Sequence, residues 1–226
     1  FYNERSSAQQ LAEPTVNFNP IAEGPEGRIV VSPDSIYNPF DENVVGITRR
    51  FVEAGPRRFE QKAKTTRAHI GLDGLVEIGS RDFTWGVDYT ATRSTQRAFS
   101  TPYADNSRMA IALGPSFRDA SGVARCGTPA APIAGCVPLN LFGPAGSITP
   151  EMLDYVTASV INRKRSDSKD FAVHAEGVVF DLPAGGVGLA TGFEHRKEDG
   201  YDHPDALIAS GNANGTGMTY RPTSGS

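Results

Sequence analysis

The stretch VGLATGFEHRK, residues Val187 to Lys197, alternates between apolar side chains and small or charged ones. A period of two predicts a β-strand, because successive side chains of an extended chain point to opposite sides. The apolar side consists of Val187, Leu189, Thr191 and Phe193. Glu194 and Arg196 lie on the other side, among glycine and alanine. The apolar side either faces the core of a soluble sandwich, or it faces lipid while the other side lines a wet interior.

Three further segments alternate in a similar way. Residues 57–72 are polar at first and become apolar on one side only near their end, as expected for a strand that leaves water for an apolar layer. The clearest alternation lies in residues 83–99, whose apolar side holds Phe83, Trp85, Val87, Tyr89 and Ala91. Residues 170–180 place Phe171, Val173, Ala175 and Val179 on one side. We therefore predict two β-hairpins, with turns at DGLVEIGSRD and DLPAGG.

The connections outside the hairpins are long, namely residues 1–56, 100–169 and 200–226. Short turns at one end and long loops at the other are typical of outer-membrane barrels, whereas a soluble sandwich distributes its loops more evenly. Within the middle connection, NSRMAIALG is interpreted as an irregular strand. SITPEMLDYVTASV predicts a short helix, because Ser147 or Thr149 can cap it and Pro150 suits its first turn.

Composition excludes several classes of protein. The chain of 226 residues is long enough for a sizeable core, yet it has no apolar run near the roughly 18 residues of a membrane-spanning helix. A net charge of −4 provides no general basic field, so we expect no nucleic-acid partner. A membrane β-barrel stays possible, since its strands need only about 10 alternating residues each.

The two cysteines, Cys126 and Cys136, flank a stretch rich in proline, glycine and alanine. A metal site would need further ligands, and no histidine lies near them in the sequence. A loop-closing disulfide is therefore the favoured interpretation, and it implies an oxidising compartment.

No enzyme signature is present in the sequence. The four histidines, His69, His174, His195 and His203, lack the HExxH spacing of a zinc site, and we interpret them as surface or strand-face residues. The glycine-rich GGVGLATG lies within a strand and opens no helix, so it does not predict phosphate binding. The acidic residues of the first loop lack EF-hand spacing. We expect no catalytic residue, no cofactor and no metal site.

Several phrases resemble the β-barrel part of TonB-dependent receptors of the bacterial outer membrane. They are IYNPF, RRFVEAGPR, GCVPLNLFGPAGSITPEMLDYV, LPAG, GFEHRKEDG and TSGS, and they extend from residue 36 onward. The long cysteine-containing phrase is the most specific of them. Family members commonly carry Glu-Tyr-Arg where this chain has Glu194, His195 and Arg196, a departure at the middle residue.

The resemblance implies an all-β fold, a transmembrane antiparallel β-barrel of which residues 1–226 are one part. The N-terminal plug domain and the remaining strands of such a receptor are absent from this chain. The implied function is active uptake of a scarce solute, such as an iron chelate or a carbohydrate, across the outer membrane of a Gram-negative bacterium. The implied partners are the TonB complex, outer-membrane lipid and the small solute itself.

The same resemblance assigns an environment to individual residues. The two turns are expected to lie in the periplasm, and the long loops are expected to lie outside the cell. The lipid-facing residues are then Trp85, Val87, Tyr89, Val187, Leu189 and Phe193. The candidates for the lumen are Glu194, Arg196, Asp88 and Glu176. The loop aromatics Tyr37, Phe40, Tyr103, Phe142 and Tyr201 either stack on the solute or pack the loops, and packing is the favoured interpretation.

Two other classes of protein fit parts of the sequence. A passive porin would share the alternation but lack the plug. A secreted soluble β-sandwich, acting as a binding module, would bury the row that contains Trp85 in a dry core.

Overall fold

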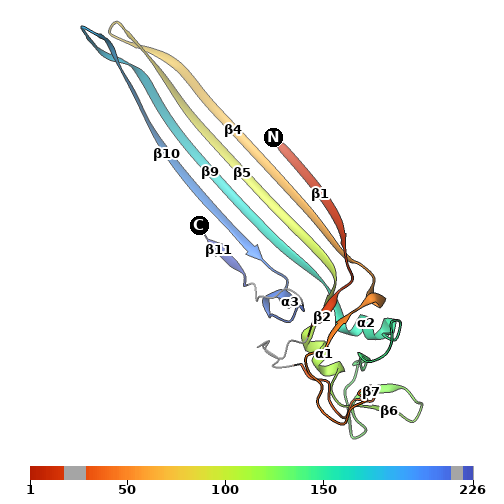
Figure 1. Ribbon diagram of the computed structural model, residues 1–226. Helices are drawn as coiled ribbons and strands as arrows, with labels where there is room; N and C mark the ends of the chain where they lie inside the picture. Colours follow the sequence, from red (N-terminus) through yellow and green to blue (C-terminus); the bar gives the residue numbers. More distant parts are fainter. Residues whose placement is uncertain (18–28, 215–220, 226) are drawn as a thin grey trace.

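A computed structural model describes residues 1–17, 29–214 and 221–225 of the chain, and its main feature is one long antiparallel sheet (Figure 1). The sheet has six strands in the order β1-β4-β5-β9-β10-β11. Their bounds are β1 Tyr2–Leu11, β4 Arg57–Ile78, β5 Arg81–Ala104, β9 Thr157–Leu182, β10 Gly185–His203 and β11 Thr223–Gly225. The predominantly β fold predicted from the sequence is confirmed, and the sheet of the described residues is open.

All four predicted strands are present, and each is longer than its alternating segment. Residues 57–72, 83–99, 170–180 and 187–197 lie within β4, β5, β9 and β10. The strands continue through polar residues because each has a paired neighbour over most of its length. The first turn is tighter than predicted: only Gly79 and Ser80 form it, and DGLVEI belongs to β4. The second turn, at Pro183 and Ala184, is where the sequence placed it.

The N-terminal strand β1 corrects the prediction that residues 1–56 form a long connection. It pairs with the polar half of β4, from Tyr2 opposite Thr66 to Leu11 opposite Arg57. Its sequence, YNERSSAQQL, has no apolar side, and all ten of its residues are exposed. Because strand formation here depends on backbone pairing with β4, periodicity could not reveal it.

The long connections form a compact loop cluster at the end of the sheet opposite the two hairpin turns (Figure 1). It holds most of the buried hydrophobic residues of the described chain, among them Phe51, Met109, Leu113 and Leu139. Its elements are β2 Thr15–Asn17, β3 Thr48–Arg50, the 3-10 helix Val52–Ala54, α1 Asn106–Ala112, β6 Ser116–Arg118, β7 Ala124–Thr128, β8 Ala131–Pro132 and α2 Pro150–Val156.

One helix of the cluster was predicted and another was not. The prediction of α2 is confirmed: Pro150 occupies its first turn, and the Thr149 hydroxyl accepts a hydrogen bond from the Met152 N–H at 3.4 Å. The prediction of an irregular strand at NSRMAIALG is wrong, because this segment forms α1. The carboxylate of Asp105 caps α1 by accepting from two backbone N–H groups, and Met109 and Ala112 are buried.

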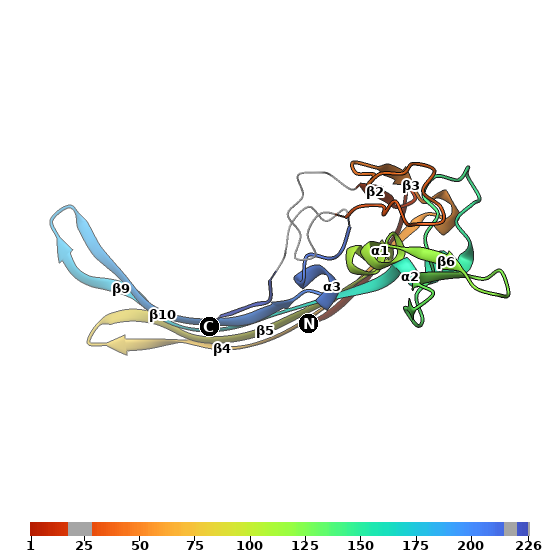
Figure 2. The same ribbon diagram turned by 90° about the horizontal axis from the view of Figure 1, so that it is seen from below.

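Strand register gives the sheet two chemically different faces. Leu72 lies opposite Val87, and Val87 lies opposite Val173, so these side chains share one side, the apolar face. The other side carries Val160, which packs against Ile208 of the short helix α3, Ala206–Ala209. Figure 2 shows the sheet curving toward the side on which α3 and the loop cluster lie. We call this second side the concave face.

A β-bulge changes the apolar face near the second turn. The register of β9 and β10 shifts at Val187 and Gly188, so that Phe180 lies opposite Val187. The predicted alternation through Val179 is therefore wrong at this point, because the extra residue moves Phe180 onto the apolar face.

Candidate functional site

The apolar face is made of rows that run across all four long strands. One row contains Leu72, Val87, Val173 and Phe193 in register. The large side chains of the face are exposed: Leu72 is 67% accessible, Phe193 63% and Leu189 55%. Within the described residues, no helix and no second sheet covers this face. All six residues predicted to face lipid, Trp85, Val87, Tyr89, Val187, Leu189 and Phe193, lie on it.

Aromatic rings on the apolar face extend over glycines of the neighbouring strands. A Cβ atom added to Gly74 would lie 3.0 Å from the Trp85 ring, and one added to Gly177 would lie 2.4 Å from the Phe83 ring. The glycines thus leave room for the large rings. This arrangement, in which an aromatic side chain shields a glycine on the next strand, fixes cross-strand register and smooths the face.

The length of the apolar face follows from strand geometry. On β4 the apolar side extends from Ala68 to Ile78, which corresponds to about 34 Å along the strand at roughly 3.4 Å per residue. Its two end rows carry charges on other strands, namely Lys169 and Lys197 in the row of Ala68 and Arg81 in the row of Ile78. Beyond Ala68, toward the loop cluster, the same side carries Lys62, Lys64 and Thr66. The strands therefore continue well past the apolar segment into a polar one.

The concave face at the level of the apolar rows carries mainly polar and charged side chains, although Leu75 and Val178 are exposed on it near the turns. All four predicted lumen residues, Asp88, Glu176, Glu194 and Arg196, share this face. Arg196 donates to Asp170 and to Glu194, at 2.9 Å in each case. Asp88 lies 3.5 Å from His69 Nε2 on the neighbouring strand. The four predicted residues thus belong to one polar strip across β5, β9 and β10, and His69 extends this strip onto β4.

Sequence reasoning missed three members of this strip. His69 and Asp170 lie in the row of Arg196, and His174 lies in a separate row of the same face, opposite both Gly86 and Gly192. The sequence contained the signal, since all three alternate with apolar residues, but only cross-strand register shows that they adjoin Asp88 and Arg196. In the part of the chain that the structure describes, no three His, Cys, Asp or Glu side chains are grouped to hold a metal ion.

The five aromatic loop candidates separate into different environments. Phe40 and Phe142 come together edge to face in the loop cluster, with ring centroids 5.9 Å apart. Tyr37 packs against the core of the cluster, as does Phe142, while Tyr103 packs near α3. Tyr201 stacks on His203 with centroids 4.5 Å apart. Of the five, Phe40 is the one whose side chain is more than half exposed, at 51%.

The loop cluster is held by a polar network around Arg49, whose side chain is 13% exposed. Its guanidinium donates to the carbonyls of Leu141 and Gly143 at 2.8 and 2.6 Å and pairs with Glu53 at 3.1 Å. Burial would raise the pKa of the Glu53 carboxyl, but hydrogen bonds from backbone N–H groups, including that of Gly146, and the charge of Arg49 lower it below its ordinary value.

The predicted disulfide between Cys126 and Cys136 is confirmed. The two Cα atoms are 5.8 Å apart, and both cysteines are buried in the core of the cluster. The bond ties β7 to the segment that leads to the buried Leu139, so it closes a stretch that contributes little packing of its own.

Comparison with known proteins identifies no relative. No family model, no curated protein and no solved structure matches the chain. Among the described residues, none of the helices combines the length and the apolar character needed to cross a bilayer.

Proposed function

We propose that the chain is part of an outer-membrane receptor that takes up a scarce solute in a TonB-dependent manner. The observation that carries the proposal is a sheet with one exposed apolar face and a charged face directly behind it. In this arrangement the apolar face contacts lipid, and the polar strip around Asp88 and Arg196 borders a water-filled lumen. The loop cluster lies outside the cell and takes part in binding the solute.

The dimensions of the apolar face support this placement. A strand tilted by about 40° places the two end rows, which carry Lys169, Lys197 and Arg81, roughly 26 Å apart in height. This separation is close to the roughly 25 Å apolar band of outer-membrane barrels, so these charges lie at its two boundaries. Aromatic residues occur near both ends of the segment, with Tyr89 and Phe171 toward the loop cluster and Phe83 toward the turns. Interfacial aromatic girdles have this distribution.

The edges of the sheet require further strands. β11 pairs only with residues 200–202 of β10, and β1 pairs only with the polar half of β4. At the level of the apolar rows, both edges of the four-stranded sheet therefore present unpaired backbone groups in the described chain. Such edges are not tolerated in hydrocarbon, so we infer that additional strands close the barrel.

Two observations weigh against the other classes. A soluble sandwich would bury the row of Trp85, but Trp85 and its neighbours Leu72 and Phe193 are exposed. A passive porin needs no large folded structure on its loops, whereas here the loops form a cluster with its own core and disulfide. A packed extracellular cluster of this kind suits a receptor that binds its solute before admitting it.

Fluorescence quenching tests the membrane placement. Trp85 is the single tryptophan of the chain, and its ring lies on the apolar face. Reconstituted into vesicles with brominated acyl chains, the protein should lose Trp85 emission, and a Trp85→Phe variant should lack the quenched component. Emission that bromine leaves unchanged would exclude contact between this face and lipid.

Uptake measurements test the transport step. Bacteria that depend on the protein for growth on an iron chelate or a carbohydrate should stop growing on it when TonB is deleted. Uptake that persists without TonB would instead indicate a passive porin.

A further inference from the structure

Beyond its apolar segment, the outer side of the sheet becomes strongly basic. The rows that follow the apolar face toward the loop cluster contain Lys62 and Lys64 on β4 and Arg93 and Arg97 on β5. The next two strands continue these rows with Arg163, Arg165 and Lys169 on β9 and Lys197 on β10. We call these eight cations the basic belt. The chain as a whole has a net charge of −4, so the belt is a local feature.

The carboxylates on the same side do not neutralise the belt. Glu4 is shared between Lys62 and Lys64, and Asp167 is shared between Arg93 and Arg165. Among the described residues, no carboxylate lies within ion-pairing distance of Lys169 or Lys197, which lie next to each other in register on β9 and β10. Two further acids lie on this side: Asp199 is opposite Asp167, and Glu60 pairs with Arg58 outside the belt. The eight cations still outnumber these four carboxylates, and the row of Lys169 and Lys197 itself contains no carboxylate.

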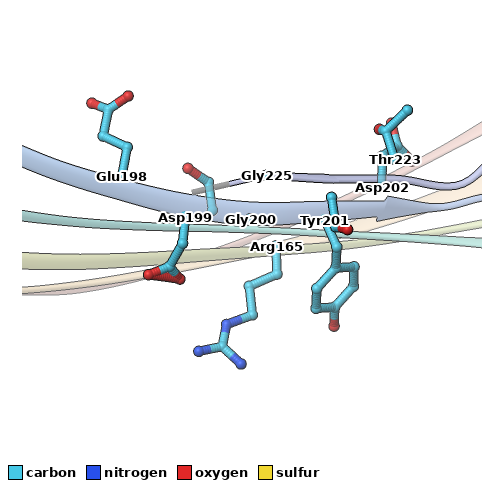
Figure 3. A pocket seen from close by; sticks show the side chains of 10 residues that line it. Arg165, Glu198, Asp199, Gly200, Tyr201, Asp202, Thr223 and Gly225 are labelled. Carbon is cyan, nitrogen blue, oxygen red and sulfur yellow. The ribbon is translucent and has the colours of Figure 1, made fainter.

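The concave face at the same level differs in composition. Opposite the belt it carries mainly uncharged side chains, such as Gln61, Gln96 and Ser166. Figure 3 shows how side chains alternate between the two sides at this level: Arg165, Asp199 and Tyr201 extend to one side of the strands, whereas Glu198 and Thr223 extend to the other. The cations therefore concentrate on the side that continues the apolar face.

The belt begins where a lipid headgroup would lie. Adjacent rows on one side of a strand are about 7 Å apart, so the Lys169 and Lys197 row follows the row of Tyr89 and Phe171 within one step. Lipid tails that cover the Tyr89 row would place their headgroups at Lys169 and Lys197. The headgroup layer adds roughly 5–7 Å on each side of the hydrocarbon. This layer covers the row of Lys169 and Lys197 and approaches the next row toward the loop cluster.

We propose that the cations of the basic belt nearest the apolar face, Lys169 and Lys197, bind the phosphate groups of anionic lipids in the outer leaflet around the protein. The inference rests on the proposed membrane placement. Lys and Arg beside hydrocarbon extend their alkyl stems along the apolar surface and place their charge among the headgroups. An anionic phosphate supplies the negative counter-charge that Lys169 and Lys197 lack in the described structure. A zwitterionic headgroup supplies it only in part, because its own cationic group offsets its phosphate. The belt thus selects the lipids that surround the barrel.

Lipid competition at Trp85 tests this selection. The protein is placed in phosphatidylcholine vesicles that contain acyl-brominated phosphatidylglycerol or acyl-brominated phosphatidylcholine, and the relative binding constant follows from the quenching of Trp85. The wild type should prefer phosphatidylglycerol. The double variant Lys169→Gln, Lys197→Gln should lose about fivefold or more of this preference, given about 1 kcal/mol per basic residue near a membrane surface.

A matched control removes the same charge from the concave face. Arg5 and Arg67 lie at the polar level of β1 and β4 but on the concave side, and the variant Arg5→Gln, Arg67→Gln should keep the wild-type preference. An equal loss in both double variants, or no preference in the wild type, would overturn the assignment of the belt. Quenching by neither brominated lipid would instead refute the membrane placement itself, so the two failures are distinguishable.

Discussion

The loop cluster and the apolar half of the sheet contain similar hydrophobic residues in opposite environments. In the cluster, Phe51, Met109 and Leu139 are fully buried. On the sheet, Ile70 and Leu72 are each 67% exposed although they belong to neighbouring rows of the apolar face. The cluster is covered by its own loops, whereas no described element covers the sheet. The difference teaches that the cluster buries its hydrophobic residues within the chain, whereas the sheet leaves an exposed apolar patch, which is consistent with the proposed contact with lipid.

The two regions also satisfy their polar groups by different means. In the cluster, side chains form hydrogen bonds with backbone groups: Arg49 donates to the carbonyl of Leu141, and Asp105 accepts from the first N–H groups of α1. In the sheet, hydrogen bonds between neighbouring strands satisfy the backbone polar groups, and the outermost strands have open edges. Substitutions should therefore affect the cluster through its buried polar network, and the sheet through its contact with the surroundings.

The largest effect is expected in the cluster, at Arg49. Arg49→Ala leaves Glu53 buried beside unpaired carbonyls and should cost roughly 3–5 kcal/mol of the free energy of unfolding of the cluster. The adjacent Arg50 pairs with Glu13 at 3.6 Å and is half exposed, so Arg50→Ala should cost about 0–1 kcal/mol. Hydrogen exchange of the cluster amides under increasing denaturant measures both. Equal effects would show that the Arg49 network does not stabilise the cluster.

The next largest effect is expected on the apolar face and should depend on depth. Phe193 lies in the middle row, so Phe193→Arg should cost roughly 2–4 kcal/mol in a bilayer, and Leu189→Arg, nearer the turns, should cost less. Ala190→Ser, on the concave face of the same strand, should be nearly neutral. Equilibrium unfolding in lipid vesicles provides the comparison. A greater loss for Leu189→Arg than for Phe193→Arg would contradict the proposed depth.

The smallest effect is a pH dependence confined to the cluster. The pKa of Glu53 is lowered in the folded protein, so its contribution to stability is complete above its ordinary value of about 4.3 and is lost as the pH falls through the lower, folded-state value. Exchange of the cluster amides should therefore accelerate below about pH 4.3. The variant Glu53→Gln should have a flatter profile, and an unchanged profile would remove Glu53 as the cause.

Periodicity predicted the parts of the fold that depend on neighbours along the chain. The four long strands, the turn at Pro183 and the capped start of α2 were predicted, and of the two candidate caps, Ser147 and Thr149, it is Thr149 that caps the helix. The strand β1 was missed because it is polar on both sides, and α1 was misassigned because its buried Met109 and Ala112 are also compatible with an irregular strand. The residues predicted to share one side of the strands do so, while the approach of His69 to Asp88 depends on register between strands.

The sequence by itself determined which side of each strand is apolar, because side-chain alternation is a local property of extended backbone. It also predicted the disulfide, because the two cysteines lack the nearby ligands that a metal site would need. Only the tertiary structure decided that the long loops form a core, that the bulge turns Phe180 outward onto the apolar face, and that eight cations align beyond it. These features arise from pairing between segments far apart in the chain, and such pairing leaves no periodic trace in any one of them.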